Sequence, residues 1–86
     1  MALGYDTERL TIHGRLAVKE ADMRKLEMSI QGDVAAVRMM LPPFVPVAEL
    51  QAQPAAVQAV ELAAKHAEYL GLQGEIAAMK KALGLA

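Results

Sequence analysis

The sequence predicts an all-α protein in which two long antiparallel helices are joined by a proline-rich loop, an arrangement known as a helical hairpin. All four prolines lie between positions 42 and 54, and a long proline-free stretch flanks them on each side. Apolar residues recur every seven positions in both stretches, which is the spacing of helices that pack along their length. The hydrophobic content is 55% but only 3% of residues are aromatic, a composition that suits helices better than a β-sheet core.

The first helix is expected over about residues 6–41. Asp6 or Thr7 is placed to cap its N-terminus, because a short side-chain oxygen accepts hydrogen bonds from the free N–H groups of the first turn. Two apolar stripes, offset by three positions, give this helix one packing face. One stripe holds Leu16, Met23, Ile30 and Val37, and the other holds Ile12, Lys19, Leu26, Asp33 and Met40.

Gly32 leaves an alternative in which the first helix breaks and Asp33 caps a new helix. The seven-residue phase of Ile30 and Val37 continues across this point, and it favours one continuous helix.

The loop is expected over residues 42–53. The first helix ends before Pro42, because a proline pushes the preceding residue out of the helical region. We expect Phe44 and Val45 to fold back over the end of the two helices as an apolar plug. An alternative takes residues 43–46, Pro-Phe-Val-Pro, as a polyproline ligand for an SH3-like partner. The plug is favoured, since the motif is short and its flanks are not basic.

The second helix is expected over about residues 54–84. Pro54 suits its first turn, where a missing N–H costs little. Gly84, followed by Leu85, is placed to end it in a Schellman motif. Glu61 and Lys65 have the spacing of an ion pair on its surface. Its packing face is formed by Leu62, Tyr69, Leu72, Ile76, Met79 and Leu83.

Aligning the two helix ends at the loop sets an antiparallel register. In this register the expected opposing pairs are Ile12 with Leu83, Leu16 with Met79, Met23 with Leu72, Leu26 with Tyr69, and Asp33 with Leu62.

Both helices carry more apolar residues than one packing face uses, so we expect this single domain of 86 residues to self-associate. A dimer of two hairpins forming a four-helix bundle is the favoured assembly. Lys19 and Asp33 are expected to fix the register as isolated polar residues among apolar ones. The expected packing and oligomer residues are Leu16, Met23, Leu26, Met28, Ile30, Val37, Val60, Leu62, Tyr69, Leu70, Leu72, Ile76, Met79 and Leu83.

Charge and motifs favour a protein-interaction role without catalysis. The net charge is −1, and acidic residues interleave with the basic cluster of the first helix, Arg9, Arg15, Lys19, Arg24 and Lys25. Nucleic-acid binding is therefore the alternative and not the favoured function. The two histidines, His13 and His66, lie on different helices with no metal-site spacing, and His66 is expected to be partly buried. No cofactor or metal is expected, and no nucleophile motif or phosphate-binding loop is present.

Four segments resemble small proteins from the early region of Mu-like transposable prophages. They are residues 5–15 (YDTERLTIHGR), 24–32 (RKLEMSIQG), 43–50 (PFVPVAEL) and the alanine-rich second helix, which ends in residues 79–84 (MKKALG). The resemblance implies a bacterial cytoplasm and a phage product that binds a host or phage protein, with no activity assigned to any residue. The sequence itself shows neither a signal peptide nor a membrane-spanning stretch, which also favours a cytoplasmic protein.

Overall fold

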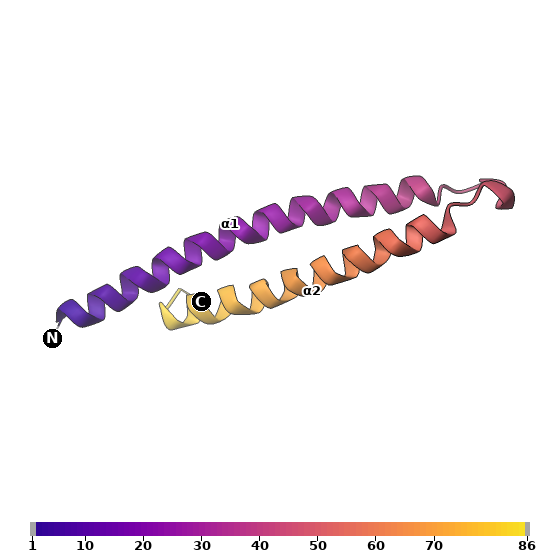
Figure 1. Ribbon diagram of the computed structural model, residues 1–86. Coiled ribbons are helices and arrows are strands. Elements are labelled where there is room, and N and C mark those ends of the chain that lie inside the picture. The colour runs from indigo at the N-terminus through magenta and orange to yellow at the C-terminus, as the bar shows by residue number, and fades with distance from the viewer. Residues whose placement is uncertain (1, 86) are drawn as a thin grey trace.

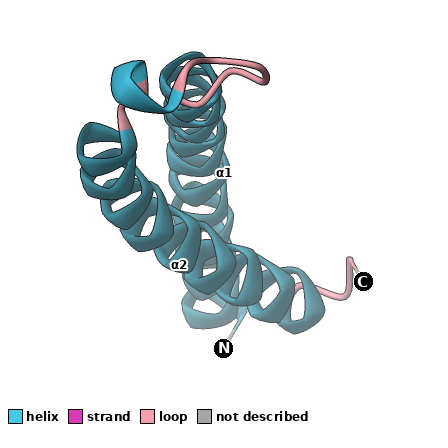
Figure 2. Ribbon diagram, turned by 90° about the vertical axis from the view of Figure 1, so that its right-hand side faces the viewer, coloured by secondary structure: helices cyan, strands magenta, loops and turns pink. Residues whose placement is uncertain are grey.

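The chain folds as a helical hairpin, as the sequence predicts. The computed structural model describes the backbone of residues 2–85 and the side chains of residues 7–85. Helix α1 spans Ala2–Met40, a short 3₁₀ turn η1 spans Val47–Glu49, and helix α2 spans Ala52–Ala82. Figure 1 shows α1 and α2 side by side and antiparallel, with the loop at one end and the N-terminus of α1 extending past the C-terminus of α2. Seen from the loop end, α2 crosses α1 obliquely (Figure 2).

The prediction for the start of α1 was wrong by four residues. The helix already includes Asp6 and Thr7, so neither residue is its N-cap. The Thr11 hydroxyl donates to the Thr7 carbonyl oxygen at 2.9 Å, which is a bond made along the inside of a helix. No proline lies before position 42, so nothing in the sequence stops the helix at the expected cap.

The rest of α1 is unbroken. It runs through Gly32 and Asp33 without interruption, so the alternative of a second helix starting at Asp33 does not hold. Its last residue is Met40, two positions before Pro42, where the clash between a proline ring and the preceding backbone disfavours further helix.

Both ends of α2 have the chemistry that the sequence predicts. Pro54 lies in the first turn, and the Ala55 N–H makes an early helical bond to the Gln51 carbonyl oxygen at 3.1 Å. At the other end Gly84 has φ +73°, in the left-handed region. The Leu85 N–H donates to the Lys80 carbonyl oxygen at 2.8 Å and the Gly84 N–H to that of Lys81 at 3.1 Å, which is a complete Schellman motif.

The two helices meet along one seam, the face on which α1 and α2 pack against each other. The predicted stripes lie there: every residue of the α1 stripes and of the α2 packing face is buried or half-buried. Leu16, Ile76 and Leu83 are the buried centre of this seam, 4–7% exposed, and Ile12, Met23 and Met79 pack against them. The core therefore lies toward the end of the hairpin that is distant from the loop.

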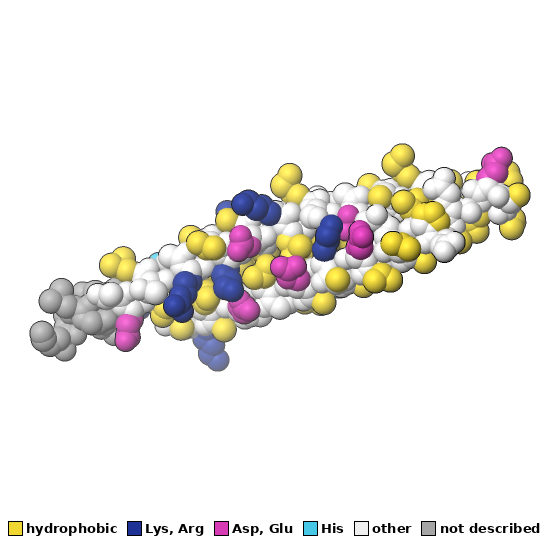
Figure 3. All heavy atoms as spheres, in the orientation of Figure 1, with side chains coloured by type: hydrophobic (Ala, Val, Ile, Leu, Met, Phe, Trp, Pro, Cys, Tyr) yellow, Lys and Arg dark blue, Asp and Glu magenta, His cyan; other side chains and the backbone are white. Residues whose placement is uncertain are grey.

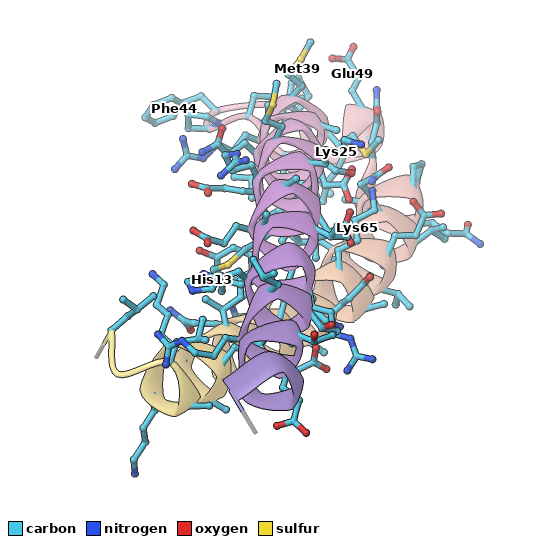
Figure 4. All side chains as sticks on the ribbon, turned by 90° about the vertical axis from the view of Figure 1, so that its left-hand side faces the viewer. His13, Lys25, Met39, Phe44, Glu49 and Lys65 are labelled. Atoms are coloured by element: carbon cyan, nitrogen blue, oxygen red, sulfur yellow. The ribbon has the colours of Figure 1, made fainter. Side chains whose placement is uncertain are left out.

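The loop does not cover the end of the helices as expected. Phe44 is fully exposed, at 102% of its reference area, while Val45 is half-buried. Phe44 has φ +66° in a turn that follows Pro43, and this left-handed backbone directs the ring away from both helices (Figure 4). The plug prediction is therefore wrong for Phe44. The same φ departs from the value of about −75° that a polyproline ligand needs, so residues 43–46 do not have that conformation either.

Candidate functional site

The seam contains polar residues from both helices, and they pair with each other. The Lys65 ammonium lies 2.8 Å from Asp33 Oδ2 and donates to the Ser29 hydroxyl oxygen at 2.8 Å. Lys19 forms a second ion pair with Glu75. The predicted register places Ser29 opposite position 66 and Lys19 opposite position 76, each one residue from the observed partner. It places Asp33 opposite position 62, which is three residues from Lys65.

The surface ion pair expected within α2 is replaced by this cross-helix contact. Lys65 turns to α1, and Glu61 instead accepts a hydrogen bond from the Gln58 amide at 3.4 Å. Sequence reasoning missed Lys65 as a seam residue, although its position is seven residues after Gln58 and before Leu72, both of which are half-buried. That seven-residue spacing is the signal from which Lys65 could have been placed in the seam.

Two open grooves follow the edges of the seam. One holds about 360 Å³, and the other, on the opposite edge, about 520 Å³. Charged side chains of both signs line each groove, and the seam side chains Met23 and Ile76 contribute to the first. The second groove includes the Ser29 hydroxyl, whose oxygen accepts the hydrogen bond from the Lys65 ammonium.

The histidines do not form a site. His13 is exposed, and so is His66, which was expected to be partly buried next to the seam. His66 lines a shallow pocket with Glu27 and Tyr69, at the edge of the seam and not inside it. Within residues 7–85, no three His, Asp or Glu side chains are close enough to hold a metal ion.

The basic residues of α1 do not form an uninterrupted basic surface. Lys19 is paired with Glu75 across the seam, and the Arg9 guanidinium donates to the Leu83 carbonyl oxygen at 3.4 Å. Lys19 and Lys25 both line the larger groove, but the acidic side chains of Asp22 and Glu68 line it with them. This arrangement does not provide the continuous basic stripe that follows a nucleic-acid backbone.

The hairpin exposes far more surface than a compact chain of its size. Its accessible surface is 6455 Å² for 9.2 kDa, whereas a compact monomer of that mass exposes roughly 4,900 Å². It measures 71 × 17 × 15 Å, with a radius of gyration of 19.5 Å where a compact domain has about 12 Å. Among the described side chains only Leu16, Ala55, Ile76 and Leu83 are buried. Each helix has a single neighbour, so the side of each helix that faces away from the seam is in solvent.

The predicted oligomer residues divide into two groups. Eleven of them lie in the seam within one chain, while Met28, Val60 and Leu70 are 73%, 71% and 50% exposed. Met28 is two positions from both Leu26 and Ile30, which are seam residues, so it lies on the far side of α1. Val60 lies on the far side of α2 for the same reason. Because these two sides point in opposite directions, one contact between two hairpins can cover only one of them.

The two outward sides differ in charge. The outward side of α1 carries Arg24, Lys25 and Arg38, all exposed. The outward side of α2 has no charged residue between positions 56 and 78. We call it the α2 outward face, and it consists of exposed Ala56, Val57, Val60, Ala63, Ala64, Ala67, Leu70, Gly71, Gly74, Ala77 and Ala78. The charged side chains of this part of α2 lie instead in the seam or at its edges, at Glu61, Lys65, Glu68 and Glu75. Figure 3 shows, on the face that it displays, hydrophobic side chains exposed along the whole rod with charged side chains between them.

An exposed helix face without charge is the reverse of an ordinary surface helix, whose polar residues point to solvent. The α2 outward face is therefore the candidate functional site of this chain. None of the described helices has the combination of length and hydrophobicity that crossing a membrane demands.

No protein-family model matches the chain, and neither the curated proteins nor the solved structures include a significant match to it.

Proposed function

We propose that this chain acts without catalysis, as a homo-oligomeric protein-interaction module whose basic unit is a dimer of hairpins. The observation that carries the proposal is the uncharged α2 outward face on a hairpin that exposes about 1,500 Å² more than a compact chain of its mass. A stable protein interface removes about 800 Å² from each partner, so the surplus is sufficient for one such contact.

Contact with a second hairpin is energetically more favourable for the α2 outward face than exposure to solvent. Val57, Val60 and Leu70 are 59%, 71% and 50% exposed, and their burial is favourable by about 25 cal/mol per Å² of apolar surface. The face holds no charge that association must desolvate, which removes the largest opposing cost. A small hairpin with one seam also gains stability from a partner, because it buries little of its own chain.

The cellular setting is a further part of the proposal. The resemblance of four segments to early-region proteins of Mu-like prophages supports a role in a bacterial cytoplasm, where the dimer binds a host or phage protein. Phe44 and Met39, at 102% and 81% exposure, project from the loop end of the hairpin and are available for such a contact (Figure 4).

The concentration dependence of thermal unfolding tests the proposal. If folding is coupled to self-association, the melting temperature measured by circular dichroism rises with protein concentration. A melting temperature that is the same at all concentrations would remove the dimer as the folded unit.

A further inference from the structure

The large side chains of the α2 outward face alternate with very small ones. Val57, Val60 and Leu70 stand out from the helix, while Gly71 and Gly74 leave gaps beside them. A face of this kind has ridges and hollows, and helices pack by placing the ridges of one into the hollows of the other.

The hairpin itself makes no use of the two hollows. A Cβ atom at Gly71 or Gly74 would meet nothing within 4 Å, so no part of α1 approaches them. Each glycine nevertheless costs the helix roughly 1 kcal/mol relative to alanine. The space at both positions opens outward, toward solvent.

The outward face is complementary to itself in one orientation. If two α2 helices pack antiparallel about a two-fold axis at Ala67, Val60 of one copy meets Gly74 of the other, and Leu70 meets Ala64. Val57 then meets Ala77, so every large side chain faces a small one. A parallel pair would place Val60 against Val60 and Gly74 against Gly74, which leaves crowding at one level and a void at another.

We propose that the second hairpin docks on the α2 outward face through its own α2, antiparallel, with the two-fold axis at Ala67. This inference rests on the proposed self-association and specifies the surface and the orientation that it uses. The four helices then lie in the order α1, α2, α2, α1, with the two α2 helices at the centre. This order differs from the four-helix bundle expected from the sequence, in which all four helices would share one core. In the proposed dimer, α1 and the loop tip lie outside the contact between the two hairpins.

Charge placement agrees with this docking. The contact covers positions 56–78 of the outward face, which carry no charge, so no ion is taken out of water. Glu61, Glu68 and Glu75 lie to one side, where they keep contact with solvent, and Glu75 is already paired with Lys19. Their mutual repulsion across the dimer is therefore weak and screened by salt.

A matched pair of glycine substitutions tests the surface. Gly74→Lys fills a hollow at the proposed contact, and Gly32→Lys makes the same change on the outward side of α1. A Cβ has open space at both positions, and lysine is a better helix former than glycine, so both variants keep the hairpin fold. Sedimentation equilibrium of the full chain is expected to show the wild-type dimer for Gly32→Lys. It is expected to show a dissociation constant raised by at least about tenfold for Gly74→Lys.

Cysteine crosslinking tests the orientation, since the chain contains no natural cysteine. In the antiparallel dimer a disulfide links Val60→Cys of one copy to Gly74→Cys of the other, so a mixture of the two variants crosslinks under mild oxidation. Neither variant crosslinks alone, because like positions are then roughly 21 Å apart along the helix, beyond the reach of about 7 Å between Cα atoms. Crosslinking of Val60→Cys with itself would establish a parallel pair and overturn the proposed orientation.

These measurements distinguish a wrong docking surface from the absence of self-association. Equal dissociation constants for Gly74→Lys, Gly32→Lys and wild type would overturn the docking surface while self-association stands. A wild-type mass of 9.2 kDa at every concentration would overturn self-association itself, and the docking surface with it.

Discussion

Asp33 on α1 and Lys65 on α2 form an ion pair across the seam, with 2.8 Å between Oδ2 and Nζ. The Asp33 side chain is only 14% exposed, and Lys65 also donates to Ser29. The pair explains how a carboxylate lies at a position that the seven-residue pattern assigns to an apolar residue. An aspartate in the seam requires a cation opposite it, and only one alignment of the helices supplies Lys65, so the pair helps to select the register.

The two charges are expected to stabilise the hairpin jointly. Asp33→Asn and Lys65→Met each remove one charge while largely keeping the shape of the side chain. A double-mutant cycle on the free energy of unfolding in urea is expected to give a coupling of about 1 kcal/mol. Strictly additive effects of the two substitutions would mean that the pair contributes nothing to stability.

Leu16 is expected to be among the most sensitive positions of the chain. It is 5% exposed in the cluster with Ile76 and Leu83, so Leu16→Ala leaves a cavity and is expected to cost 2–5 kcal/mol of unfolding free energy, about the whole stability of a small domain. Leu10→Ala, on the same helix at 72% exposure, is the matched control and is expected to change stability by less than about 0.5 kcal/mol. Thermal melts at one protein concentration make the comparison, and similar losses for the two variants would contradict the position of the core.

Gly84 and Gly32 are expected to respond oppositely to alanine. At both positions a Cβ has open space, but Gly84 has φ +73° whereas Gly32 lies inside α1. Gly84→Ala is expected to destabilise by about 1 kcal/mol because an L side chain is strained in the left-handed region. Gly32→Ala is expected to stabilise by about the same amount. Urea unfolding measures both, and a loss of stability for Gly32→Ala would argue against an unbroken α1.

Phe44 is expected to be dispensable for folding. It is fully exposed with φ +66°, a conformation that asparagine adopts more readily than phenylalanine. Phe44→Asn is therefore expected to leave stability unchanged or raise it by up to about 1 kcal/mol. Removing a buried phenylalanine usually costs about 3 kcal/mol or more of unfolding free energy. A loss of that size for Phe44→Asn would indicate that the ring is buried over the helix ends, as the sequence predicted.

The parts of the fold that sequence reasoning predicted rest on periodicity and on backbone chemistry. Leu16, Met23 and Ile76 lie in the seam because the seven-residue spacing forces them onto one side of a helix. Gly84 ends α2 because few other residues tolerate its backbone conformation. These signals depend only on residues that are near one another in the sequence. They can therefore be recognised without knowing how the rest of the chain folds.

The parts that sequence reasoning missed depend on relations that no local pattern contains. The direction of Phe44 follows from one backbone torsion within a run of prolines, and hydrophobicity alone suggested a buried ring. Lys65 was assigned to Glu61 because that pairing lies within one helix, whereas its real partner is 32 positions away in α1. Met28 and Val60 were assigned to one interface, and only the position of the seam shows that they point in opposite directions.

The central claim is that this hairpin works as a self-associating unit, and its solution mass tests that claim most directly. Light scattering on the wild-type chain at increasing concentration is predicted to give twice the chain mass of 9.2 kDa, with dissociation on dilution. A mass of one chain throughout the micromolar range would contradict the claim.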